Sequence, residues 1–167
     1  MKNKVFILYW SLCALLLTSC HKTKTFHQFS PIPTEGWGKT DTIGFDISKL
    51  HSDTLIINID IRHDYSYPYQ DIYLTIRENL SDSTRYKTNT LHLKLADEFG
   101  DWTGDGWSYL TQSSHHYKTI LKPQFSENSR IEIQSLMKDS LLQGVTDIGI
   151  SINHKDDKPS LRRVLKK

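Results

Sequence analysis

Acidic residues, glycines and tryptophans are concentrated between residues 97 and 107, in the stretch DEFGDWTGDGW. Carboxylates in a glycine-rich loop are typical of calcium sites, but an EF-hand loop needs regularly spaced oxygen ligands, a central glycine, a closing glutamate and flanking helices. This stretch matches neither the spacing nor the flanks. The sequence therefore does not predict an EF-hand, and a looser calcium site built partly from backbone carbonyls is the remaining metal interpretation.

A sugar-binding site is a second interpretation of the same residues. Trp102 and Trp107 would stack on a sugar ring, because exposed aromatic rings serve as binding platforms. Asp101 or Asp105 would then accept hydrogen bonds from the sugar hydroxyls. These four residues define a glycan-binding hypothesis for the protein.

A turn between two strands is the third interpretation. Gly100, Gly104 and Gly106 would supply positive φ angles, and the aspartate carboxylates would bond their own backbone. The two tryptophans would then pack over the end of the folded domain. This interpretation requires no ligand.

Tyrosines dominate the other dense stretch, HDYSYPYQDIY, at positions of the same parity: Tyr65, Tyr67, Tyr69 and Tyr73. In an extended chain alternate side chains share a face, so all four would point the same way. Pro68 restricts the residue before it to extended conformations and cannot donate to a central strand. We expect an edge or a crossover whose tyrosines contact a protein partner; the alternative is that they close the rim of the core with their hydroxyls in water.

Motifs typical of enzymes are absent from the sequence, which has no nucleophile elbow, P-loop or HExxH spacing. His115 and His116 are adjacent, so on a strand they would point to opposite faces and could not hold one metal ion together. We therefore predict a protein without catalytic residues, without a metal site and without a cofactor.

The start of the chain has the features of a bacterial lipoprotein signal peptide. Lys2 and Lys4 precede an apolar run from residue 5 to residue 17, and LTSC ends at Cys20. The run is shorter than the roughly 20 residues that span a bilayer. We predict a signal peptide at 1–19, cleaved so that the mature chain begins at Cys20 and is held on a membrane by palmitate and related acyl chains.

The mature chain has the length and charge of one neutral domain. Without Lys2 and Lys4 its basic residues balance its acidic ones, so nothing indicates a nucleic-acid partner. Cys13 leaves with the signal peptide and Cys20 carries lipid, so the domain folds without disulfides. Residues 156–167 form a basic tail, which we expect to be a solvated C-terminus.

Apolar residues at every second position recur along the chain, as in TLIINIDIR, and predict half-buried strands. The expected strands cover residues 42–47, 54–62, 71–78, 90–96, 107–111, 117–122, 130–134 and 147–153. No long helical segment separates them. We therefore predict an all-β protein, an antiparallel β-sandwich of jelly-roll or immunoglobulin-like type with about eight strands.

The remaining segments complete the predicted organisation. Residues 20–40 are polar and contain prolines and glycines, so we expect a lipid-anchored tether and lead-in before a sandwich at 41–155. The segment SLMKDSLLQG, residues 135–144, fits either a short helix capped by Gly144 or the end of a strand followed by a turn.

Three of these stretches, together with the lipobox, resemble the GldH gliding-motility lipoproteins of the Bacteroidota. IRHDYSYPYQDIYLTI resembles that family's arginine, tyrosine-proline-tyrosine and apolar strand. LADEFGDWTGDGW is similar to its aspartate-glycine-tryptophan-glycine-glycine turn, and LQGVTDIGISI to its near-terminal strand. The matches occur in order over most of the mature chain. Asp71 and Lys138 stand where the family often has asparagine and arginine.

The resemblance implies a non-catalytic envelope lipoprotein of the gliding-motility machinery, associated with type IX secretion. It implies a scaffold or assembly role through contacts with other cell-envelope proteins. The residues after Cys20, HKTKT, lack the acidic cluster that resembles a surface-export signal in this phylum. We therefore expect attachment to the outer membrane on its periplasmic face, with a periplasmic or surface glycan-binding module as the alternative function.

Overall fold

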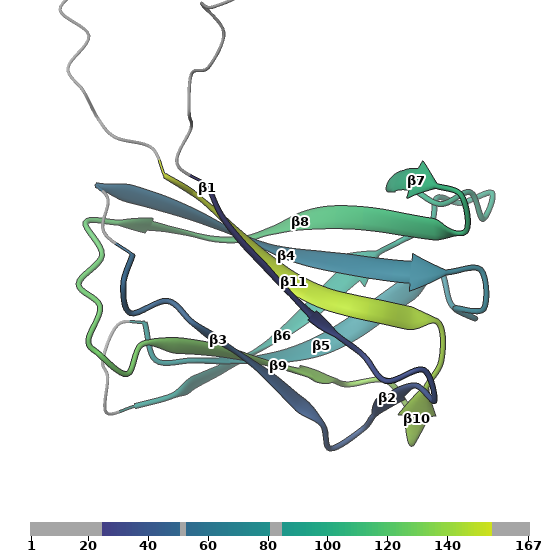
Figure 1. The fold of residues 1–167 in the computed structure, drawn as a ribbon, viewed down its shortest axis with the longest axis horizontal. Helices are drawn as coiled ribbons and strands as arrows, with labels where there is room; N and C mark the ends of the chain where they lie inside the picture. The colour runs from purple at the N-terminus through teal and green to yellow at the C-terminus, as the bar shows by residue number, and fades with distance from the viewer. Residues whose placement is uncertain (1–24, 51–52, 81–84, 155–167) are drawn as a thin grey trace, which may run out of the picture.

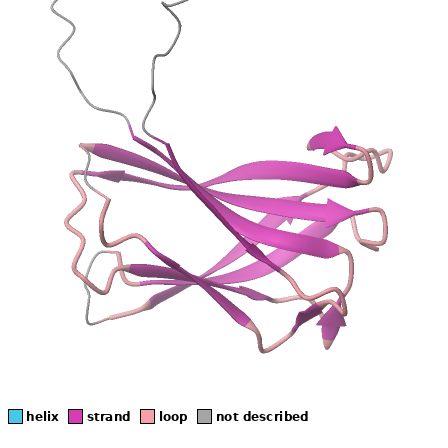
Figure 2. Ribbon diagram, in the orientation of Figure 1, coloured by secondary structure: helices cyan, strands magenta, loops and turns pink. Residues whose placement is uncertain are grey.

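The chain folds into strands joined by turns, and a computed structural model describes residues 25–50, 53–80 and 85–154 (Figure 1). Among these residues there is no helix, and hence none that could cross a membrane (Figure 2). The described strands are β1 (Thr25–Pro31), β2 (Trp37–Gly38), β3 (Thr42–Asp46), β4 (Thr54–Asp64), β5 (Asp71–Glu78), β6 (Lys87–Lys94), β7 (Asp105–Trp107), β8 (Leu110–Leu121), β9 (Arg130–Ser135), β10 (Leu141–Leu142) and β11 (Val145–His154).

Two antiparallel sheets face each other and form a sandwich (Figure 1). The larger sheet has the order β1-β11-β4-β8-β7 and the smaller one the order β3-β9-β5-β6, while β10 and β2 make a short separate pair. Every pairing is antiparallel. The predicted all-β antiparallel sandwich is confirmed.

The core lies between the two sheets and is built from the alternating aliphatic residues. Those with no measurable exposure include Leu55, Ile57, Ile59 and Ile61 of β4, Ile72, Leu74 and Ile76 of β5, Ile131 and Ile133 of β9, and Ile148, Ile150 and Ile152 of β11. Each such side chain contributes roughly 1.5–3 kcal/mol when it leaves water. Burial of one face of each strand therefore selects this register, because a slip by one residue would turn the aliphatic set outward.

The prediction of a tether and lead-in at residues 20–40 is wrong for residues 25–31 and 37–38, which form β1 and β2. β1 pairs along its whole length with β11, from Thr25 opposite Asn153 to Pro31 opposite Asp147. Trp37 of β2 is buried, and its indole Nε1 donates to the carbonyl of Asp41 at 3.1 Å. The alternation is weak in β1 because it is an edge strand with a partly exposed outer face, so sequence periodicity does not reveal it.

Two other local predictions are corrected or decided. Residues 107–111 are not one strand, because Ser108, with a φ of 59°, and Tyr109 form the two-residue turn between β7 and β8. The predicted strand at 117–122 is the last part of β8. Of the two interpretations of residues 135–144, the structure has the strand end and turn.

Side chains of β1 lie across the outer face of the larger sheet. Phe29 is opposite Gly149, and a Cβ at that glycine would stand 2.5 Å from Cδ1 of the phenylalanine ring. The guanidinium of Arg62 lies 3.6 Å from the centroid of the same ring. Two residues earlier, His27 Nε2 reaches past β11 to Asp60 Oδ2 at 3.0 Å. These contacts attach the edge strand to the sheet through side chains as well as backbone.

We expect Gly149→Ala to lower the free energy of unfolding by about 1–3 kcal/mol, the usual cost of overpacking. The added methyl would push the Phe29 ring from its place over β11. Gly106→Ala is the matched control, because a Cβ there would meet only the carbonyl of Leu110 at 4.0 Å, and it should stay within about 0.5 kcal/mol of wild type. Urea denaturation measures both, and equal losses would contradict the packing role of Gly149.

Candidate functional site

The stretches that carry the sequence resemblance meet at one end of the sandwich, on the right in Figure 1. We call this the loop end and define it by residues 64–71, 95–109 and 135–144. The opposite end, where β1 begins beside the last residues of β11, is the terminal end. Segments far apart in the sequence therefore form one surface.

The four tyrosines do not share one face. The chain turns after β4, where the Asp64 carboxylate accepts from the backbone and hydroxyl of Ser66 at 2.8 and 2.6 Å. This turn directs Tyr67 into the core, with 3% of its surface exposed, and its hydroxyl donates to the Asp71 carbonyl at 2.8 Å. Burial is the main cause that raises the pKa of Tyr67 well above its ordinary value. The expected tyrosine surface is therefore corrected to exclude Tyr67.

The backbone at Gly144 lies directly against the backbone at Tyr67. Gly144 has a φ of 81°, and a Cβ there would stand 2.2 Å from the Tyr67 amide nitrogen. Its carbonyl accepts a hydrogen bond from the Asp64 amide at 2.8 Å. Only glycine satisfies both the left-handed conformation and this close approach.

Beneath the turn, His63 and Trp102 form the inner layer of the loop end. His63 is fully buried, and its ring meets that of Trp102 edge to face at 4.3 Å. His63 Nδ1 lies 3.2 Å from the Asp64 carbonyl, which can only accept, so we assign the ring proton to Nδ1. Nε2 is buried without a hydrogen-bond partner in the described part of the chain. Burial therefore lowers the pKa of His63 below its ordinary value.

Residues 95–104 form a turn that crosses from β6 in the smaller sheet to β7 in the larger one. The Asp97 carboxylate accepts from the amides of Phe99 and Asp101, both at 2.9 Å, as a turn-forming aspartate should. The prediction of positive φ is right for Gly100, at 89°, and wrong for Gly104 and Gly106. At Gly104 glycine is needed for space instead, since a Cβ would stand 2.3 Å from the Gln112 carbonyl.

The residues of the glycan hypothesis have separate environments. Trp102 is half-buried against the core, while Asp101 and Asp105 are exposed. The side chain of Trp107 lies outside the described residues, as do the signal peptide and the predicted lipidation site Cys20. Within the described ranges, no three histidine, cysteine, aspartate or glutamate side chains gather in a way that could hold a metal ion.

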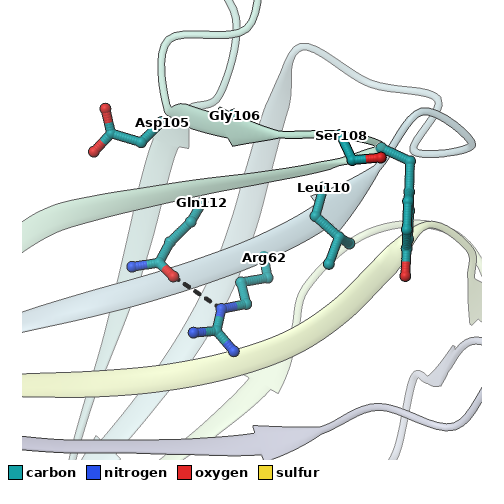
Figure 3. Close-up of a pocket in the computed structure, with 7 residues that line it drawn as sticks. Arg62, Asp105, Gly106, Ser108, Leu110 and Gln112 are labelled. Atoms are coloured by element: carbon teal, nitrogen blue, oxygen red, sulfur yellow. Dashed lines mark hydrogen bonds between the residues drawn. The ribbon is translucent and has the colours of Figure 1, made fainter.

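An open groove of about 670 Å³ lies beside the β7–β8 hairpin (Figure 3). Its lining includes Arg62, Asp105, Ser108, Tyr109, Leu110 and Gln112. Of the residues proposed for glycan binding, Asp105 lines the groove and Trp102 and Asp101 do not. The sequence did not point to the other lining residues, because Arg62 and Gln112 match the polar face of ordinary strands.

Two hydrogen bonds connect the segments around the groove. Arg62 Nε donates to Gln112 Oε1 at 2.8 Å, shown dashed in Figure 3. The hydroxyl of Tyr65 donates to the Ser108 carbonyl at 2.9 Å and so connects residues 64–71 to the hairpin. The groove therefore lies beside the tyrosine-rich turn.

Aromatic side chains remain exposed around the groove and turn: Tyr65, Tyr69, Tyr73, Phe99 and Tyr109. Several are already held in position. The hydroxyl of Tyr69 donates to both carboxylate oxygens of Asp139, at 3.0 and 2.8 Å, and this hydrogen bond is the main cause that raises the pKa of Tyr69. Tyr73 stacks on His92 with centroids 4.4 Å apart. Ordered tyrosines beside an arginine have the composition of protein-contact hot spots.

Comparison with known proteins agrees with the motif resemblance. A family profile described as GldH lipoprotein matches residues 24–152, which run from the start of β1 into β11. A curated protein of Flavobacterium johnsoniae, named gliding motility lipoprotein GldH, is 28% identical over 154 residues. The alignment covers 87% of this chain and 94% of that protein.

Burial of His63 makes stability depend on pH. Because its folded pKa is below the unfolded value near 6.5, its contribution is complete above pH 6.5 and is lost as the pH falls toward the folded pKa. His63→Phe keeps an aromatic ring against Trp102 without titrating. We expect this variant to lose less unfolding free energy than wild type between about pH 7.5 and about pH 5.

Some pH dependence should remain in His63→Phe, because burial also lowers the pKa of His115. His116→Phe is the control, since His116 is exposed and its Nε2 hydrogen-bonds the Thr119 hydroxyl at 2.9 Å at the surface. Urea titrations at the two pH values measure the loss. An unchanged pH dependence in His63→Phe would show that the buried ring does not cause it.

Proposed function

This chain belongs to the GldH lipoprotein family, and from that membership we propose that it is a lipid-anchored, non-catalytic component of the gliding-motility machinery. It acts as a scaffold or assembly factor through contacts with other cell-envelope proteins. In this proposal the protein sits at the periplasmic face of the outer membrane in association with type IX secretion. The support for the leaflet is the sequence HKTKT after Cys20, which lacks an acidic export cluster.

The separation of the two ends of the sandwich carries the proposal. Cys20 precedes Thr25, the first residue of β1, by five residues, and five residues span at most about 18 Å. The lipid would therefore hold the terminal end near the membrane. β4 runs from that end, where Leu55 pairs with His154, to Asp64 at the loop end, a distance of about 30 Å at 3.3 Å per residue. In this proposal the loop end faces away from the bilayer.

Chemistry at the loop end suits a protein partner. Tyr65, Tyr69 and Tyr109 combine apolar rings with hydroxyl groups, and tyrosine is enriched where protein surfaces meet. Two of these hydroxyls are hydrogen-bonded within the protein, which limits the conformational entropy lost on binding. Tyr67 supports this surface from below and does not reach a partner.

Glycan binding remains the alternative prediction. It requires the face of Trp102 to receive a sugar ring, whereas Trp102 packs against His63 and the core. The protein-contact function is the better supported of the two because its residues are exposed together at one end.

Cys20→Ser should move the protein from the membrane fraction to the soluble fraction of the cell. The lipid is the proposed anchor, and each buried methylene of an acyl chain contributes about 0.8 kcal/mol. Cys13→Ser is the matched control, because that cysteine leaves with the signal peptide and the variant should stay membrane-bound. Fractionation followed by immunoblotting measures both. Retention of Cys20→Ser in the membrane would disprove the anchor.

Tyr65→Ala combined with Tyr69→Ala should reduce crosslinking to envelope partners by about tenfold or more, as expected for hot-spot aromatic residues. Tyr86→Ala is the control, because Tyr86 is 41% exposed, lies just before β6 at the terminal end and contacts Arg77 instead. It should change recovery less than about twofold. Crosslinking in native envelopes followed by mass spectrometry gives the yields. The proposal fails if wild type reproducibly recovers no protein, or if all variants recover partners equally.

A further inference from the structure

Arg62 projects into the groove of the loop end without a carboxylate partner. No ion pair within 4.0 Å involves it among the described residues. Arg77, on the smaller sheet, is different because its guanidinium pairs with Glu132 at 3.2 Å. Arg62 is therefore a fixed positive charge available to a ligand.

The guanidinium of Arg62 is held from two sides. The ring of Phe29 supports it at 3.6 Å, and Gln112 accepts from Nε at 2.8 Å. Gly149 leaves the space in which Phe29 lies. Both terminal nitrogens of the fork have no partner in the described part of the chain, and such a fork matches the two oxygens of a carboxylate. Little side-chain entropy remains to be lost when a ligand binds.

Nearby acidic residues do not neutralise this charge. Asp105 lines the groove, but its carboxylate points away from Arg62 in Figure 3. Asp147 pairs with Arg62 in the backbone register of β11 and β4 without forming an ion pair with it. Asp60 is buried and already bonded to His27, Ser114 and Ser151.

We propose that this groove binds an aspartate or glutamate side chain from an acidic segment of a partner protein, with the fork of Arg62 as its anchor. The inference rests on the proposed protein-contact function and names the chemistry of the contact. Gln112 uses its oxygen for Arg62, and its amide nitrogen, which points away from Arg62 in Figure 3, is left as a further donor. Leu110 and Tyr109 supply an apolar wall for the stem of the acidic side chain.

The position of the groove favours a protein over a lipid headgroup. Arg62 lies seven residues along β4 from Leu55 at the terminal end, which is about 23 Å. In the proposed orientation, a lipid phosphate in the membrane that holds Cys20 does not reach this far. The groove is also open to solvent rather than enclosed, which suits a segment of polypeptide better than an enclosed small molecule.

Carbodiimide crosslinking of full-length Arg62→Lys in native envelopes tests the inference. The reagent joins an amine to a carboxylate without a spacer, whereas an arginine does not react. We expect a new covalent product with a second protein, and peptide mass spectrometry should place the bond between position 62 and an aspartate or glutamate of that protein. Arg77→Lys is the matched control and should form a bond within the chain, to Glu132.

Three other results would overturn the inference. A bond from position 62 only to Asp105 or Asp147 of the same chain would mean that a carboxylate of this chain neutralises the charge of Arg62. A partner that is captured in wild type but never joined at position 62 in Arg62→Lys would mean that its carboxylates lie elsewhere. A glycan found in the groove by photo-crosslinking from position 109 would identify a different occupant.

Removal of the Arg62 guanidinium distinguishes a failure of this inference from a failure of the proposed function. Arg62→Gln should lower partner capture at least about tenfold, because the partner's carboxylate would be left without its counter-charge. Gln112→Leu keeps the charge but not the bond that orients it, and should lower capture by a smaller factor. If Arg62→Gln captures as much partner as wild type, the carboxylate site is wrong and the protein-contact function stands. If wild type captures no partner, both fail.

Discussion

The backbone contact between Gly144 and Tyr67 determines the shape of the loop end. Because Gly144 has no side chain and has a positive φ, the backbone of the turn after β4 can pack directly against it. That turn buries Tyr67 and leaves Tyr65 and Tyr69 at the surface. Gly144, about 75 positions further along the chain, therefore positions the exposed tyrosines. The tyrosine motif and the motif that contains Gly144 depend on each other for this reason.

A second glycine has the corresponding effect on the outer face of the larger sheet. Gly149 admits the ring of Phe29, the ring supports the guanidinium of Arg62, and Gln112 orients it. This support for the guanidinium matters because an arginine on an exposed strand face ordinarily loses considerable side-chain entropy when it binds a ligand. Here β1, the strand that follows the proposed lipid anchor, also supports the proposed partner site through Phe29, so attachment of β1 and recognition at the groove are physically linked.

The overall fold was largely predictable because it depends on a local pattern. Alternation of apolar and polar residues identified most strands, and residues 71–78 match β5 at both ends. β1 was missed because an edge strand buries too little to show the alternation. Ser108 was missed as a turn residue because serine seldom adopts a positive φ. Both failures occur where backbone pairing decides the structure more than side-chain burial does.

Sequence by itself determined that this protein is an all-β lipoprotein of the GldH type, since strand periodicity, the lipobox and ordered motifs can each be read along the chain. Tertiary structure alone decided which residues are functional candidates. Tyr67 and Trp102 turned inward, whereas Arg62 and Tyr109 came together at a groove. The physical reason is that strand alternation assigns a side chain to a face, but burial, charge pairing and exposure depend on neighbours contributed by distant strands.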